Sequence, residues 1–290
     1  MTTAKRTPLK IPDDLPWKQN VGLLLDAVQV ENLLPKLFAW DCTVKVEPLY
    51  LQTRFAQLRD VSPCLVRVRS PSDPALVEFL AHAQEHWGYL ICSVAPWAEM
   101  VAHLRWLASI KHPSGADMLL RIANPAVARA LLGDTQTSAA TLFGPCQRVV
   151  VINPIGDGWD HFIRHSEAPI ADHSALYQLS EHQWSLLESA SFSKMVSELY
   201  QHMSEFFPQY QSTLTAHERW DHLYRLAKRA AACGHDSEAD IWLYANAHGL
   251  LGDQVMGEDP EILQLLAPEQ PSPEQRMHLI SSLAERKCFP

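Results

Sequence analysis

The fold class can be predicted from four segments: SPCLVRVRS (residues 62–70), YLICSVA (89–95), MLLRIANP (118–125) and CQRVVVI (146–152). LVRVR alternates apolar and polar side chains, which predicts a half-exposed strand. YLICSVA is apolar throughout, which predicts a strand covered on both faces. Because such runs alternate with helix-like segments, the sequence predicts an α/β lobe with a mixed or parallel sheet, flanking helices and QRVVVI as its closing strand.

The sequence indicates where the helices between these strands begin. Asp73-Pro74 and Asn124-Pro125 each place proline in a first helical turn, behind a side chain that can cap the helix. A further helix, WAEMVAHLRWLASI, is predicted over residues 97–110, with one apolar side.

The pattern changes in the C-terminal part of the chain. Ser180-x-x-Gln183 and Thr215-x-x-Glu218 are capping boxes, and each precedes apolar residues at helical spacing. Further caps are predicted at Ser237, Asp259-Pro260 and Ser272-Pro273, and no strand pattern follows. With the segment 156–171 as a linker, we expect an α/β lobe over residues 1–165 and an all-α lobe over residues 166–290.

Composition places the chain among soluble globular proteins. Of its 290 residues, 47% are hydrophobic and 20% are charged. No apolar stretch approaches the roughly 20 residues that span a bilayer, and the first residues do not resemble a signal peptide. The six cysteines are scattered without a CxxC pair. We therefore expect reduced, buried thiols, a cytoplasmic location and no membrane partner.

The net charge of −9 lies entirely in one part of the chain. Residues 1–169 hold 16 basic and 16 acidic side chains, whereas residues 170–290 hold 8 basic and 17 acidic ones. An acidic lobe argues against nucleic acid as a partner, because binding to phosphates requires Lys and Arg. It is consistent with a solvated acidic face, or with a surface that attracts a basic protein segment.

No catalytic motif stands at the predicted strand ends. The sequence contains no GxGxxG, GxxxxGK[ST] or GxSxG. His82/His86 and His161/His165 have the spacing of metal ligands on a helix, yet lack the glutamate of zinc proteases. A metal-dependent hydrolase that uses His161, His165 and Asp172 is the alternative function. Cys233-Gly-His235-Asp236 suggests a thiol–imidazole couple, but it coincides with a predicted helix end.

Side chains that could contact a partner are aromatic or cationic. Arg105 and Arg121 are predicted to form ion pairs at the edge of the α/β lobe rather than to bind a ligand. Helical spacing places most aromatic residues of the second lobe in its core. Four of them are candidates for lining a partner groove: Trp220, Tyr224, Trp242 and Tyr244.

The α/β lobe resembles the domain-of-unknown-function 4123 family, the adaptor chaperones of bacterial type VI secretion. The resemblance covers about residues 20–155 and rests on the order and spacing of short motifs. LLLDA, VSPCLVRV, HWGYLICS, HLRWL and MLLRIANP are the longer ones. The family-like positions are Asp26, Trp87, Gly88, Arg121, Asn124, Pro125, Phe143, Gly144 and Pro145.

Two positions depart from the family pattern. Asn124-Pro125 stands where the family tends to have Asp-Pro, and we expect asparagine to cap the following helix equally well. Leu51-Gln52-Thr53 stands where a glycine-containing turn would be expected.

The resemblance implies a cytoplasmic adaptor without catalysis or cofactor. It would bind one toxic effector and load it onto the VgrG spike protein for secretion. In the family the α/β lobe is the common part and the helical lobe is fitted to the effector. We therefore expect the acidic helices to hold a basic or amphipathic effector segment.

Overall fold

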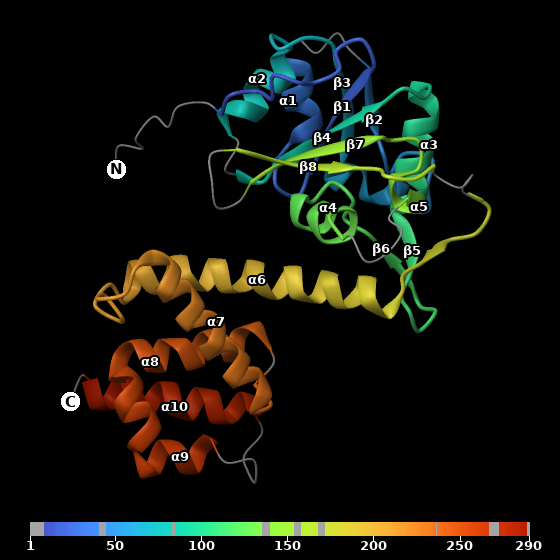
Figure 1. The fold of residues 1–290 in the computed structure, drawn as a ribbon. Helices are drawn as coiled ribbons and strands as arrows, with labels where there is room; N and C mark the ends of the chain where they lie inside the picture. Colours follow the sequence, from blue (N-terminus) through green and yellow to red (C-terminus); the bar gives the residue numbers. More distant parts are fainter. Residues whose placement is uncertain are drawn as a thin grey trace. The chain divides into compact units, whose positions relative to one another are not determined.

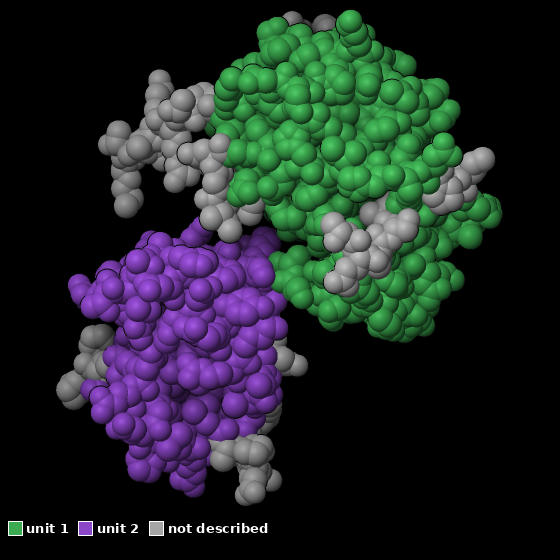
Figure 2. All heavy atoms as spheres, in the orientation of Figure 1, with its two compact units in different colours: residues 1–190 green, residues 191–290 purple. Residues whose placement is uncertain are grey.

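The chain forms two compact units in the computed structural model, unit 1 over residues 1–190 and unit 2 over residues 191–290 (Figure 2). The structure describes residues 9–40, 45–82, 85–134, 140–153, 158–167, 172–235, 237–266 and 273–288. Unit 1 combines sheets with helices, and unit 2 is helical (Figure 1). The predicted fold class is therefore confirmed. The functional division at residue 165 stays a prediction, since chain contacts group residues 166–190 with unit 1.

The main sheet of unit 1 has the strand order β2-β3-β1-β4-β7-β8, and each pair of neighbours runs antiparallel. The strand QRVVVI is not the last one as predicted, because WDHFI from the predicted linker pairs along it. Trp159, Phe162 and Ile163 give that segment the aromatic and β-branched side chains that suit a strand. The strands are β1 (Asn20–Leu25), β2 (Val46–Pro48), β3 (Cys64–Val68), β4 (Gly88–Ser93), β7 (Arg148–Ile152) and β8 (Trp159–Ile163).

A smaller sheet of unit 1 has the order β6-β5-β9. β5 pairs antiparallel with β6 and parallel with β9, so the pairing over both sheets is mixed. The helix predicted to reach Ile110 ends earlier, because Ile110 lies in β5 opposite Met118 and Tyr177. These tertiary pairings override the local helical pattern. The elements are α3 (Trp97–Leu107), β5 (Ser109–Lys111), β6 (Asp117–Leu119) and β9 (Tyr177–Gln178).

Helices cover both faces of the main sheet. Leu65 and Val66 of β3 point into different apolar clusters and both are fully buried, so the predicted half-exposed strand is wrong. The reason is the second layer of helices, which the alternation LVRVR does not reveal. One face is covered by α1 (Leu33–Ala39) and α2 (Pro74–Ala81), the other by α3, α4 (Pro125–Leu132) and α5 (Ala140–Phe143). A short 3₁₀ helix, η1, spans Ala56–Val61.

Helix α6 (Glu181–Phe206) begins in unit 1 and continues into unit 2. Its start carries the predicted capping box, in which Ser180 N donates to Gln183 Oε1 and Gln183 N donates to Ser180 Oγ. Trp184 and Leu187 pack against the core of unit 1, whereas Val196, Leu199 and Met203 belong to the core of unit 2.

Unit 2 is built from the rest of α6 and four further described helices. Thr215, Ser237 and Asp259 cap their helices as predicted. Ser272 lies outside the described residues. α8 is interrupted at Gly252, whose φ of 80° and ψ of 161° are open essentially to glycine alone. The helices are α7 (Ala216–Ala232), α8 (Glu238–Glu258), α9 (Pro260–Leu266) and α10 (Pro273–Cys288).

Candidate partner-binding site

Two family-like positions of unit 1 form an ion pair whose carboxylate is buried. Asp26 directly follows β1, and its Oδ2 accepts from Arg121 Nη2 at 2.7 Å. The Asp26 side chain is 4% exposed and that of Arg121 is 34% exposed. Asp26 Oδ1 also accepts from Val28 N at 3.0 Å. The pair joins the end of β1 to the segment before α4, which assigns it a role in holding the fold.

Trp87 and Gly88 pack at the start of β4. The Trp87 ring stacks on His82 with 4.1 Å between centroids, and Trp87 O accepts from Asp26 N. His82 is the C-cap of α2, so this helix ends at Ala81. Gly88 lies so close to β1 that a Cβ there would stand 1.9 Å from Leu24 O. The motif therefore encodes a close approach of two central strands.

Phe143, Gly144 and Pro145 enclose a buried histidine. Gly144 has a φ of 53°, and a Cβ on it would stand 2.3 Å from the His103 ring. The Pro145 carbonyl accepts from Ser93 Oγ at 2.6 Å, and Phe143 is buried in the core. Burial lowers the pKa of His103 to about 4. This motif therefore packs closely around the neutral imidazole of His103 and has a structural role in unit 1.

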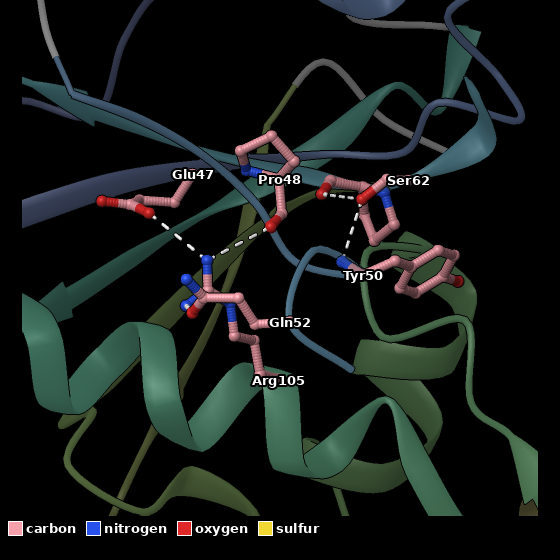
Figure 3. Close-up of polar contacts among 7 residues, drawn as sticks. Glu47, Pro48, Tyr50, Gln52, Ser62 and Arg105 are labelled. Carbon is pink, nitrogen blue, oxygen red and sulfur yellow. Dashed lines mark hydrogen bonds and ion pairs between the residues drawn. The ribbon is translucent and has the colours of Figure 1, made fainter. Parts of the chain in front are cut away.

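The two departures from the family pattern are accommodated locally. Asn124 Oδ1 accepts from Ala126 N at 2.9 Å, with Pro125 in the first turn of α4, so asparagine caps the helix as expected. Gln52 occupies the predicted glycine turn with a φ of 66°. Its Oε1 accepts from Arg105 Nη1 at 3.1 Å, which helps to hold a conformation that glycine would adopt more readily (Figure 3).

Arg105 contacts β2 and the segment that follows it. Its Nη2 lies 3.4 Å from both Glu47 Oε2 and Pro48 O, and the adjoining Tyr50 N donates to Ser62 Oγ at 3.0 Å (Figure 3). Arg105 and Arg121 thus both make ion pairs, in keeping with the predicted structural role.

The predicted aromatic residues of unit 2 lie half-buried around its core. Trp220 stacks on Tyr224 with 5.3 Å between centroids. Tyr224 also meets Phe192 edge-on at 5.3 Å. Trp242 packs near His202, and Tyr244 packs edge-on against His248. Tyr224 lines the pocket described next, and the other three do not line that pocket. Partner binding by all four stays a prediction.

That pocket, here called the α7 pocket, has a volume of about 560 Å³. Five of its residues come from α7, and one comes from α8 directly after the interruption at Gly252. It combines three cations with one carboxylate, although unit 2 is acidic. The lining residues are His222, Tyr224, Arg225, Lys228, Arg229 and Asp253.

Asp253 lies at the centre of a polar network. Its Oδ1 accepts from Tyr210 Oη and from His248 Nδ1, each at 2.6 Å, and its Oδ2 accepts from Gln211 Nε2 at 2.5 Å. His222 Nε2 lies 2.8 Å from Tyr210 Oη. Since the tyrosine proton points to Asp253, the imidazole donates to the tyrosine oxygen. Both carboxylate oxygens of Asp253 therefore already accept hydrogen bonds from neighbouring side chains.

The pKa shifts in this network favour one charge state near neutral pH. Burial opposes ionisation of Asp253, but hydrogen bonds from Tyr210 and His248 outweigh it, so the pKa of Asp253 is lowered. Burial lowers the pKa of His248 and of His222, against the opposing effect of Asp253. Asp253 is thus ionised and both imidazoles are neutral.

The alternative metal site is not assembled in the described part of the chain. His161 lies on β8, a strand that ends at Ile163 before His165, so the helical geometry expected for His161/His165 is wrong. His161 Nδ1 contacts Arg148, and Asp172 Oδ1 accepts from Ser174 N. No group of three His, Cys, Asp or Glu side chains among the described residues could hold a metal ion.

The cysteines behave mostly as expected. Cys64, Cys92 and Cys146 are buried and unbridged, and burial raises the pKa of Cys64 to about 12. Cys233 is exposed and is the C-cap of α7. Asp236 and Cys42, and the side chain of Cys288, lie outside the described residues.

Fold and site thus define a two-unit protein with a charged surface pocket. Residues 23–140 match the family model described as "Domain of unknown function (DUF4123)". This match confirms the resemblance seen in the sequence. No solved structure matches the chain.

A relative matches almost the whole chain. It is the accessory protein VasW of Vibrio cholerae serotype O1, which is 28% identical over 274 residues. The match covers 93% of this chain and 90% of the relative, so it extends through both units. Within the described residues, no helix combines the length and apolar character that crossing a bilayer requires.

Proposed function

We propose that this protein is an adaptor of the bacterial type VI secretion system. It binds a specific toxic effector in the cytoplasm and loads it onto the VgrG spike protein, and it uses no cofactor. One observation carries the proposal: similarity to an accessory protein extends over 93% of the chain, well beyond the family domain at residues 23–140. The helical unit is therefore shared with an accessory protein.

The contents of the site support binding rather than catalysis. The family-like residues of unit 1 are engaged in ion pairs, close packing and caps. In unit 2 the exposed cations and half-buried aromatic rings of α7 offer the side-chain types that dominate protein interfaces. A carboxylate whose oxygens accept several hydrogen bonds is a poor general base, because its pKa is lowered.

The expected contact surface of the C-terminal region has an acidic part and a locally basic part. The excess of acidic residues over residues 170–290 favours attraction of a basic effector by long-range steering. The α7 pocket has the opposite local sign. The two surfaces would thus recognise different parts of the partners.

Co-expression tests the function directly. The full chain, tagged, is produced with the protein encoded next to it and with VgrG, then captured and analysed by native mass spectrometry. An equimolar complex with the neighbouring protein, and capture of VgrG with the effector only when the chain is present, is the expected result. A toxin encoded at an unrelated locus is the control. Failure to hold either partner, or turnover of a substrate by the purified chain, would contradict the proposal.

A further inference from the structure

Three cations of the α7 pocket have no carboxylate partner among the described residues. Arg225, Lys228 and Arg229 make no ion pair there. Other cations of unit 2 are engaged: Lys194 with Glu198 and Lys287 with Asp259. Unpaired cations would be ordinary in a basic protein. Three cations without a carboxylate partner are unexpected over residues 170–290, which hold 8 basic and 17 acidic residues.

Helix geometry brings these charges together on one side. His222, Arg225 and Arg229 are spaced by three and four residues, so their side chains project from one face of α7. The opposite side of the helix is buried through Leu223, Leu226, Ala227 and Ala230. Like charges at this spacing repel each other slightly. The arrangement therefore costs a little stability, and within the described part of the unit no carboxylate pairs with these three cations to offset it.

Asp253 offsets only one of the three positive charges in the cluster. Its oxygens are held by Tyr210, His248 and Gln211, and the imidazoles around it are neutral. Two positively charged groups thus remain in excess of the one carboxylate that lines the pocket. An incoming anion meets no competing free carboxylate there.

The pocket also offers apolar surface. Tyr224 stacks on Trp220, and Lys228 Nζ lies 4.3 Å from the centroid of the Phe192 ring. Long cationic side chains present aliphatic stems below their charged ends. Such a surface suits an acidic side chain that has an apolar neighbour in sequence.

We propose that the α7 pocket receives an acidic segment of a partner protein, with carboxylates at Arg225, Lys228 and Arg229 and an apolar side chain against Tyr224. The inference rests on the proposed function for the nature of the partner, a secreted client or spike component. Charge complementarity with the three cations predicts that the bound segment of this partner is acidic. A nucleic acid fits less well, because the net charge of the surrounding unit repels a polyanion.

Fluorescence anisotropy on the full chain tests the pocket without any natural partner. The probe is a short labelled peptide in which glutamates flank a phenylalanine, and its glutamine counterpart is the comparison. We expect the glutamate peptide to bind, its affinity to fall as salt rises, and the glutamine peptide to bind at least about tenfold more weakly.

Two matched triple variants locate the binding. Arg225→Gln/Lys228→Gln/Arg229→Gln is expected to lower the affinity for the glutamate peptide about tenfold. Lys18→Gln/Arg59→Gln/Arg286→Gln changes the net charge equally at exposed positions outside the pocket and should bind as the wild type does. Glutamine maintains helix propensity, and circular dichroism checks that both variants are folded.

Three outcomes would overturn the inference: equal binding of both peptides, equal loss in both triple variants, or tighter binding of a labelled single-stranded oligonucleotide through the same three residues. Capture of the neighbouring effector separates this failure from failure of the function. If the wild type holds the effector or VgrG and the α7 triple variant holds both equally well, the pocket is not the contact, but the adaptor function stands.

Discussion

Five arginines of unit 1 pair with carboxylates, whereas three cations of α7 in unit 2 line a pocket and pair with none that the structure describes. Arg54, Arg105, Arg121, Arg129 and Arg148 each lie within ion-pair distance of an aspartate or glutamate. In the more acidic unit, three neighbouring cations have no such partner among the described residues. Charge in unit 1 therefore maintains the fold, and charge on α7 is available to another molecule.

The largest effect is expected where β1 and β4 approach each other in unit 1. Gly88→Ala places a Cβ 1.9 Å from the Leu24 carbonyl oxygen, which can move only with the strand. We expect a loss of at least about 4 kcal/mol in unfolding free energy, or failure to fold, measured by urea denaturation. Gly158→Ala has no atom within 4 Å of the new Cβ and should be nearly neutral. Similar stabilities for both variants would refute the close approach.

The next largest effect is expected at the ion pair of Asp26 and Arg121 in unit 1. Arg121→Met leaves the Asp26 carboxylate buried without its cation, and we expect a loss of about 3 kcal/mol. Asp26→Leu/Arg121→Met removes both charges and should recover much of that loss, which a double-mutant cycle measures. A double variant as unstable as the sum of the single ones would show that the two residues act separately.

Mild acid should weaken unit 1 through His103. Its folded pKa of about 4 lies below the unfolded value of 6.5, so the unfolded state takes up protons first as pH falls. Stability is therefore complete above pH 6.5, and about 2 kcal/mol is lost between pH 7 and pH 5. NMR titration of the imidazole gives the folded pKa. A midpoint near 6.5 would contradict the burial of a neutral ring.

In unit 2, the interruption of α8 positions Asp253. Gly252→Ala imposes a side chain at a φ of 80° and should cost about 1–2 kcal/mol, although nothing lies within 4 Å of the new Cβ. Gly257→Ala, in the same helix and equally uncrowded, should not destabilise. Thermal unfolding compares the two variants. Equal stability would mean that α8 can continue without the interruption.

The smallest effect on stability is expected at the cations of α7. Arg225→Gln/Lys228→Gln/Arg229→Gln removes exposed charges that pair with no described carboxylate, so the unfolding free energy should change by less than about 0.5 kcal/mol. Denaturation of the full chain measures it. A large loss would place these side chains among the structural charges, like those of unit 1.

Local signals in the sequence predicted helix starts well. Asn124, Thr215 and Ser237 cap their helices because a cap depends on residues two or three positions away. Strand neighbours were harder to predict. The strand at 159–163 lies in a predicted linker, and Ile110 leaves its predicted helix for a sheet. Both depend on partners distant in sequence.

The α7 pocket was missed for a different reason. Net charge averaged over residues 170–290 is negative and conceals a local cluster. The signal was present as Arg225, Lys228 and Arg229 at helical spacing. Asp253 reaches the pocket only through the interruption at Gly252, which the sequence pattern did not indicate.

The adaptor function and the role of α7 are tested together by capture of the neighbouring effector with three full-length proteins: the wild type, the α7 triple variant and the charge-matched triple variant. Native mass spectrometry and titration would give stoichiometry and affinity. An equimolar complex with the wild type and the matched control, weakened about tenfold in the α7 variant, is the result this account predicts. A chain that binds neither the effector nor VgrG would contradict the adaptor function, and equal binding by all three proteins would contradict the role of α7.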